Sequence, residues 1–143
     1  MKRVAVASAI TAALAGSVVA GGSASAATPV YGTSCSNRHG AYGEAWFKWS
    51  GKTHLEDVRL TVEDTAADGH HVGIRLGAIK PDGNIYYWGL HEEFGGKGAS
   101  HTWTTSATLS AGIRTVFVSV NTTEGSKNLW TCVSLPGADN PSY

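Results

Sequence analysis

The chain carries little charge, and none of it is concentrated. Asp, Glu, Lys and Arg make up 15% of the 143 residues, with 11 basic residues against 11 acidic ones. Lys2 and Arg3 both fall within the first 26 residues, so the remainder has nine basic and 11 acidic residues and a formal charge of −2. Nucleic-acid binding needs a concentrated basic face. The sequence therefore argues against a nucleic-acid partner.

Long apolar runs are also scarce. The run Val4 to Ala20 follows two basic residues, is interrupted by hydroxyl side chains, and falls short of the roughly 20 apolar residues that span a bilayer. It precedes Ala24-Ser25-Ala26, the small-x-small pattern after which a signal peptidase cuts. We predict that residues 1–26 are a cleaved signal peptide, with a membrane anchor as the alternative. The protein is then secreted and extracellular, with no membrane segment after cleavage.

The sequence has only two cysteines, and their positions argue against a thiolate metal site. Neither Cys35 nor Cys132 has a second Cys or His at chelating distance in sequence. An even number of cysteines in an oxidising compartment predicts one disulfide between them, and two free thiols are the alternative. Such a bond would join the two ends of a single domain, residues 27–143.

No stretch after Ala27 has the three-and-four spacing of an amphipathic helix, whereas alternation with period two recurs. In 42–50, for example, Gly43, Ala45, Phe47 and Trp49 share one side, while Trp46 falls among charged residues. Further strands are predicted over 55–64, 71–79, 85–90, 102–108, 113–120 and 128–135, followed by a short tail over 136–143. About seven strands predict an all-β fold, a two-sheet antiparallel β-sandwich, with a barrel as the second choice.

Turn residues separate these strands. Thr65 to Gly69 ends in Asp-Gly, and Lys80 to Asn84 contains Pro-Asp-Gly, both patterns of tight turns. They predict that 55–64, 71–79 and 85–90 form a meander, with the first turn a hairpin.

Motifs for metal binding and catalysis are incomplete. Asp64 to His71 imitates part of a calcium loop, but Ala66 and Arg75 stand where oxygen ligands belong. The adjacent His70 and His71 point to opposite faces of a strand and cannot close on one ion. No Gly-x-Ser-x-Gly elbow occurs, so no catalytic residue is assigned. We predict no metal and no cofactor; enzymatic function is unsupported without being excluded.

Exposed aromatic side chains are the positive indication of function. Alternation places Trp46 beside Glu44 and Lys48, and it places Tyr86 and Trp88 on one side of their strand. Planar rings stack on sugars or anchor protein interfaces, although core packing is the more common role of a Trp. The candidate ligand-binding residues are Trp46, Tyr86, Trp88 and Arg75, helped by the loop around His91 to Lys97.

Several features together resemble a known group. They are the D-x-x-A-D-G turn of Asp64 to Gly69, the downstream Trp88, the segment Val116 to Val120 and the late Cys132. The chain is similar in these to short secreted proteins of unknown function in Streptomyces and related actinomycetes. The resemblance implies a compact extracellular β domain and brings no catalytic residues.

Three functions remain open at this point. The first is a non-catalytic module that binds a glycan or an extracellular protein through exposed aromatics. The second is a secreted inhibitor or competition factor acting on a protein partner, and the third is an enzyme of unrecognised type. The sequence does not define the oligomeric state. Asn121 begins an Asn-Thr-Thr glycosylation sequon, and the sequence does not define whether Asn121 is glycosylated.

Overall fold

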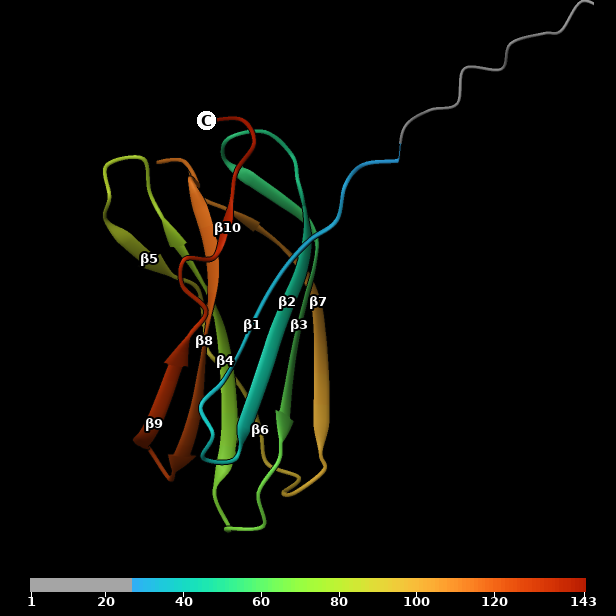
Figure 1. Cartoon of the computed structure of the whole chain (residues 1–143), viewed down its shortest axis with the longest axis vertical. Coiled ribbons are helices and arrows are strands. Elements are labelled where there is room, and N and C mark those ends of the chain that lie inside the picture. Colours follow the sequence, from blue (N-terminus) through green and yellow to red (C-terminus); the bar gives the residue numbers. More distant parts are fainter. Residues whose placement is uncertain (1–26) are drawn as a thin grey trace, which may run out of the picture.

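Two antiparallel sheets face each other across an apolar core. The computed structural model describes residues 27–143, so the predicted signal peptide lies outside the described residues. Figure 1 shows the two layers. The ten strands are β1 (Tyr31–Ser36), β2 (Ala41–Trp49), β3 (His54–Asp64), β4 (His71–Ile79), β5 (Ile85–Tyr87), β6 (His91–Glu93), β7 (Ser100–Thr108), β8 (Thr115–Glu124), β9 (Lys127–Val133) and β10 (Ala138–Asp139).

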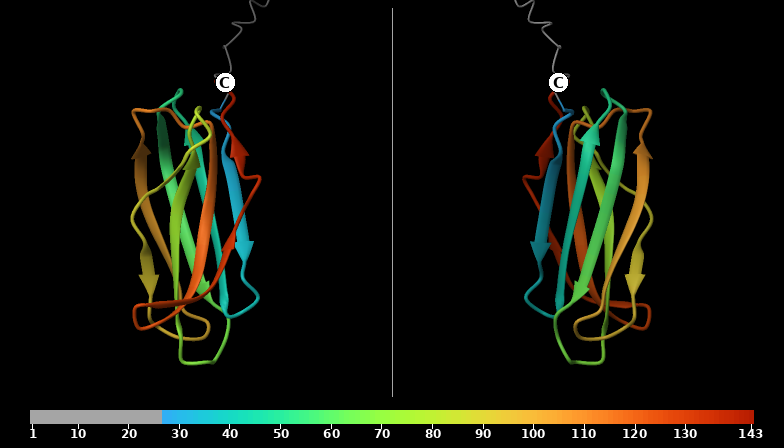
Figure 2. Two further views of the ribbon diagram at one scale, coloured as in Figure 1. Left: turned by 90° about the vertical axis from the view of Figure 1, so that its left-hand side faces the viewer. Right: turned by 90° about the vertical axis from the view of Figure 1, so that its right-hand side faces the viewer.

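The four-stranded sheet has the order β1-β2-β3-β7, and all its neighbours are antiparallel. In the six-stranded sheet, β8 and β4 are central; β9 and β10 pair with β8, and β5 and β6 pair with β4. Figure 2 shows β7 at one lateral side of the sandwich and β1 at the other. The predicted all-β sandwich is confirmed.

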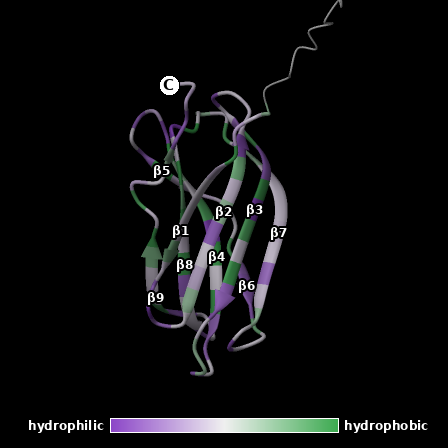
Figure 3. Ribbon diagram, turned by 45° about the vertical axis from the view of Figure 1, so that its right-hand side comes forward, coloured by the Kyte–Doolittle hydropathy of each residue, from purple (hydrophilic) through white to green (hydrophobic). Residues whose placement is uncertain are grey.

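The core forms because apolar residues alternate on the inner faces of both sheets. Alternating hydrophobic and hydrophilic segments are visible along β2 and β3 in Figure 3. Side chains that are at most 2% exposed fill the space between the sheets: Phe47, Leu55, Val58, Leu60, Val62, Val72, Ile74, Leu76, Ile113, Val116, Val118 and Val120. The inward set of β2 is the one that alternation predicts, and Trp46 points outward.

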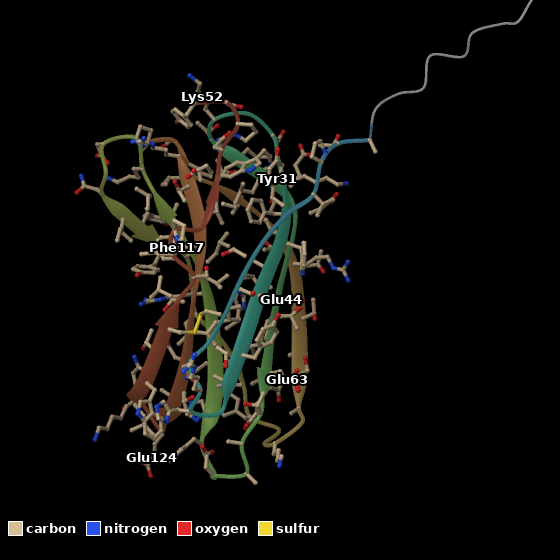
Figure 4. All side chains as sticks on the ribbon, viewed as in Figure 1. Tyr31, Glu44, Lys52, Glu63, Phe117 and Glu124 are labelled. Carbon is tan, nitrogen blue, oxygen red and sulfur yellow. A yellow bond between two sulfur atoms is a disulfide. The ribbon has the colours of Figure 1, made fainter. Side chains whose placement is uncertain are left out.

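The predicted disulfide is present. Cys35 of β1 and Cys132 of β9 are bonded, and the bond is drawn in yellow in Figure 4. It connects an outer strand of one sheet with an outer strand of the other, 97 residues apart in sequence. A bond of this kind is compatible with an exported protein. In residues 27–143, no helix has the length and hydrophobicity needed to cross a membrane.

The predicted meander is wrong at its first step. β3 and β4 lie in different sheets, so the turn Thr65 to Gly69 crosses from one layer to the other and is not a hairpin. β4 and β5 do pair, as predicted. Local turn chemistry is the same in both turns: Asp68 Oδ1 accepts the His70 N–H at 3.0 Å before β4, and Asp82 Oδ1 accepts the Asn84 N–H at 2.9 Å before β5.

Three strands lie outside the predicted seven: β1, β6 and β10. Residues 136–143, predicted as a tail, contain β10 and the buried Asn140. The Asn140 side-chain amide donates to the carbonyls of Gly51 at 3.0 Å and Ile113 at 2.8 Å. These bonds fix the C-terminal segment to the loops at one end of the sandwich.

Candidate functional site

A shallow groove of about 720 Å³ lies on the outer face of the four-stranded sheet. Three of its residues stand in one row across the sheet, because Trp46 of β2 is opposite Arg59 of β3, and Arg59 is opposite Thr104 of β7. Lys48, Asp57 and Thr61 line the groove beside this row. It combines one large ring with charged and hydroxyl groups.

The Trp46 ring lies directly over the β1 backbone. Trp46 is 46% exposed. A Cβ added at Gly32, its cross-strand partner, would lie 2.5 Å from ring carbon Cζ3 and 2.6 Å from Cε3. A side chain at position 32 would therefore occupy the space of the indole. The missing Cβ lets the ring rest on β1, which leaves its other face toward solvent and limits its motion.

A bulge in β3 places a carboxylate beside the ring. The β2–β3 register shifts between Trp46 and Lys48, and within the bulge Asp57 has a φ of 50°. Asp57 Oδ2 accepts a hydrogen bond from Lys48 Nζ at 2.7 Å. This hydrogen bond, reinforced by the charge of Asp57, raises the pKa of Lys48. The pair positions one donor and one acceptor at the edge of the groove.

Further polar groups on this face are fixed by their neighbours. The Tyr42 hydroxyl donates to Glu44 Oε2 at 2.8 Å, and this bond, with burial and the Glu44 charge, raises the pKa of Tyr42. Glu44 is labelled in Figure 4 on β2. The hydroxyls of Thr61 and Thr102 are 2.8 Å apart across β3 and β7. Among the described carboxylates, none lies within ion-pair distance of Arg59, so its donors remain available.

The structure does not bring the four predicted residues together. Arg75 lies on the outer face of the other sheet, with its guanidinium 3.9 Å from the centroid of the Tyr87 ring. Tyr86 is 41% exposed and meets Trp88 edge-on, with ring centroids 5.1 Å apart. Trp88 is partly buried against the core. Only Trp46 therefore belongs to the groove.

Histidines and acids make pairs but no larger cluster. His71 Nε2 is 3.1 Å from Glu92 Oε1, and His101 Nδ1 is 3.6 Å from Glu93 Oε2. Within residues 27–143, no three His, Cys, Asp or Glu side chains gather as metal ligands would. His91 to Glu93, predicted as part of a loop, forms β6.

The glycosylation sequon has an unfavourable position for modification. Asn121 lies inside β8, paired with Gly73 of β4 and Thr131 of β9, and it is 7% exposed. Its Oδ1 accepts a hydrogen bond from the Ser119 hydroxyl at 3.3 Å. A glycan is attached to an accessible surface side chain, so the folded chain does not present this one.

Several members of the groove were not singled out from the sequence. Arg59 and Thr61 alternate in the sequence with the apolar Val58, Leu60 and Val62, which is typical of the polar side of a strand, but which strands flank Trp46 depends on sheet order. Gly32 and Thr104 become site residues only through the pairings β1–β2 and β3–β7. A lone glycine on the neighbouring strand carries no such indication in the sequence.

Comparison with known proteins leaves the groove as the basis for assigning function. No family model, no curated protein and no solved structure matches this chain. The resemblance to short secreted actinomycete proteins accordingly stays a prediction.

Proposed function

We propose that this chain is a secreted, non-catalytic module that binds a glycan across the outer face of the four-stranded sheet. The observation that carries the proposal is the Trp46 ring, half exposed and resting on Gly32, with fixed polar groups beside it. Sugar rings present a flat apolar face and a rim of hydroxyls. A flat aromatic ring flanked by hydrogen-bonding side chains complements both features.

Each polar group has a role in this arrangement. Arg59, without a carboxylate partner, offers guanidinium donors next to the ring. Asp57 and Glu44 offer acceptors, and Thr61 and Thr104 offer hydroxyls that both donate and accept. The groove is open, which suits an extended chain that enters and leaves along the face. A glycan bound in this way needs no bond-breaking group.

Trp46→Ala tests the proposal, with Trp130→Ala as its matched control. The two side chains have similar exposure, 46% and 40%, but Trp130 lies on β9, stacked on His39 at a centroid distance of 4.5 Å. We expect a panel of soluble polysaccharides to protect the wild-type fluorescence from iodide quenching. Protection should disappear in Trp46→Ala and persist in Trp130→Ala. Equal protection in both variants, or none in the wild type, would contradict glycan binding at the groove.

A second candidate, an inhibitor acting on a protein partner, is favoured by the loop after β6. Phe94 is 69% exposed and stacks on His71 at a centroid distance of 4.5 Å. The loop is held by the Gly95 N–H bonded to Glu93 Oε1 at 2.7 Å and by the Gly98 N–H bonded to the Asp64 carbonyl at 2.7 Å. A preorganised loop with one protruding ring suits insertion into a partner's pocket. Phe94→Ala should abolish such binding without affecting the groove.

A further inference from the structure

The two lateral sides of the sandwich are built differently. On the β1 side, bonds join the two sheets: the Cys35–Cys132 disulfide, Thr33 Oγ1 to Ser134 Oγ at 2.6 Å, and Asn37 Nδ2 to Thr122 Oγ1 at 2.7 Å. On the β7 side, the polar contact between the sheets is the looser His101–Glu93 pair at 3.6 Å. A cleft of about 180 Å³ between β7 and the segment around Trp88 reaches the core residues Leu60 and Leu76 there. The β7 side is therefore open.

β7 lacks the features that protect a free sheet edge. Exposed edge strands usually carry charges, a proline or a bulge, or they are very short. β7 is nine residues long, Ser-His-Thr-Trp-Thr-Thr-Ser-Ala-Thr, without Pro, Gly, Lys, Arg, Asp or Glu. It pairs with β3 on one side, no strand of the described chain pairs with its other side, and Figure 2 shows it at the lateral edge of the sandwich. Its outward backbone N–H and C=O groups remain free to pair with another strand.

We propose that β7 pairs antiparallel with β7 of a second copy of this chain, forming a two-fold symmetric dimer with a continuous eight-stranded sheet. The strand is self-complementary: in the register that pairs all nine residues, Thr104 lies opposite its own copy and Thr102 lies opposite Ser106. No like charges meet in this register. Trp103 is partly buried against the core, with its ring centroid 4.9 Å from that of His91, which lines the cleft together with Thr105. In the dimer, Trp103 lies opposite Thr105 of the other copy, so the contact covers the mouth of the cleft.

The pairing closes on itself. The remaining edge of each four-stranded sheet is β1, which takes no part in a contact that pairs β7 with its own copy. A two-fold contact through β7 therefore ends at two copies and does not propagate into a fibre.

The dimer also places the two grooves in one line. The functional meaning of this alignment rests on the proposed glycan binding. Trp46, Arg59 and Thr104 form one row, and Thr104 is the centre of the proposed pairing. The row continues across the two-fold axis through Thr104, Arg59 and Trp46 of the second copy. Five strand spacings separate the two tryptophans, about 24 Å. One long glycan could lie along both grooves and gain from the high effective concentration of the second site.

Light scattering and sedimentation of the purified chain across a dilution series test the pairing without any glycan. We expect twice the mass of one copy at high concentration. Thr104→Lys places two like charges opposite each other at the centre of the contact, and we expect it to weaken dimerisation by about tenfold or more. Ser34→Lys, on the outer face of the opposite edge strand, is the matched control and should leave the dimer intact.

Mixing two variants gives the sharpest result. Thr104→Lys and Thr104→Glu should each dimerise more weakly than the wild type alone and should form a heterodimer when mixed, because opposite charges then meet across the axis. Circular dichroism and thermal melts confirm that both variants fold. A monomeric wild type, or a dimer unchanged by Thr104→Lys, would overturn the pairing. Neither result depends on glycan binding, which the Trp46 variant tests separately.

Discussion

Adding one methyl group at each of two strand glycines tests how aromatic rings are positioned on this sandwich. Gly32 lies under Trp46, and Gly77 lies under Phe117; in both cases an added Cβ would collide with ring carbons. The two rings differ in their freedom to move. Trp46 is 46% exposed, whereas Phe117 is 0% exposed and has the Tyr87 ring edge-on at a centroid distance of 5.5 Å.

The expected costs follow from that difference. Phe117 has no space to move into, so Gly77→Ala should lower the free energy of unfolding by about 2–3 kcal/mol, typical of overpacking. Trp46 can swing toward solvent, so Gly32→Ala should cost less than about 1 kcal/mol, partly offset by the stiffer unfolded chain. Yet the displaced indole no longer rests on β1, and we expect Gly32→Ala to weaken glycan binding by about tenfold.

Equilibrium denaturation, followed by circular dichroism, measures the first effect, and polysaccharide titration measures the second. Gly89→Ala is the control, because a Cβ there would have no heavy atom within 4 Å. The reasoning is refuted if Gly32→Ala destabilises the fold as much as Gly77→Ala. It is also refuted if Gly32→Ala leaves the accessibility of Trp46 to iodide unchanged.

Three other predictions follow from single contacts. Cys132→Ser removes a bond between residues that are 97 apart in sequence, and it should lower the free energy of unfolding by up to about 4–5 kcal/mol. An unchanged denaturation midpoint, together with two titratable thiols in the wild type, would contradict the disulfide. Because Glu44 raises the pKa of Tyr42, this hydrogen bond stabilises the fold below the ordinary Tyr value of 10.0 and is lost as pH rises through the folded pKa. Ultraviolet titration should show Tyr42 ionising at lower pH in Glu44→Gln, and an identical titration curve would exclude the bond. Gly69→Val forces a branched side chain into a φ of 76°, so it should lower the free energy of unfolding by about 1–2 kcal/mol. Asp68→Ala loses one hydrogen bond and should lower it by less. Equal, negligible effects of both variants in denaturation would show that the turn is misplaced.

Alternation predicted the strands in which the residues that face the core recur at every second position, although β8 is buried on both faces. β2, β3, β4 and β8 all have inner residues that the period-two pattern identifies, and the outward position of Trp46 follows from the same pattern. β1 was missed because Tyr-Gly-Thr-Ser-Cys-Ser contains no apolar series, and its residues are half-buried or exposed. β6 and β10 have three and two residues, too few to show a period.

Sheet membership could not be predicted in the same way. The Asp-Gly turn before β4, which crosses to the opposite layer, has the same Asp-to-backbone hydrogen bond as the turn between the paired strands β4 and β5. Which occurs depends on β2 and β7 taking the two positions beside β3. The groove depends on this order, since Gly32, Arg59 and Thr104 come from three strands that are distant in sequence. One candidate, Trp46, was identified from the sequence, and its surroundings were not.

The position of the disulfide also determines how the chain would respond to a mechanical load. Cys35 precedes β2 and Cys132 lies near the end of β9, so almost the whole sandwich is enclosed between them. Tension applied to residues 27 and 143 would pass from β1 to β9 through the sulfur atoms. Peeling of the short segments outside the cysteines would relieve it, while β2 to β8 carry no load. The strands that carry Trp46, Arg59 and Thr104 would stay folded under such shear, whereas the β1 segment with Gly32, which precedes Cys35, would peel from beneath the ring.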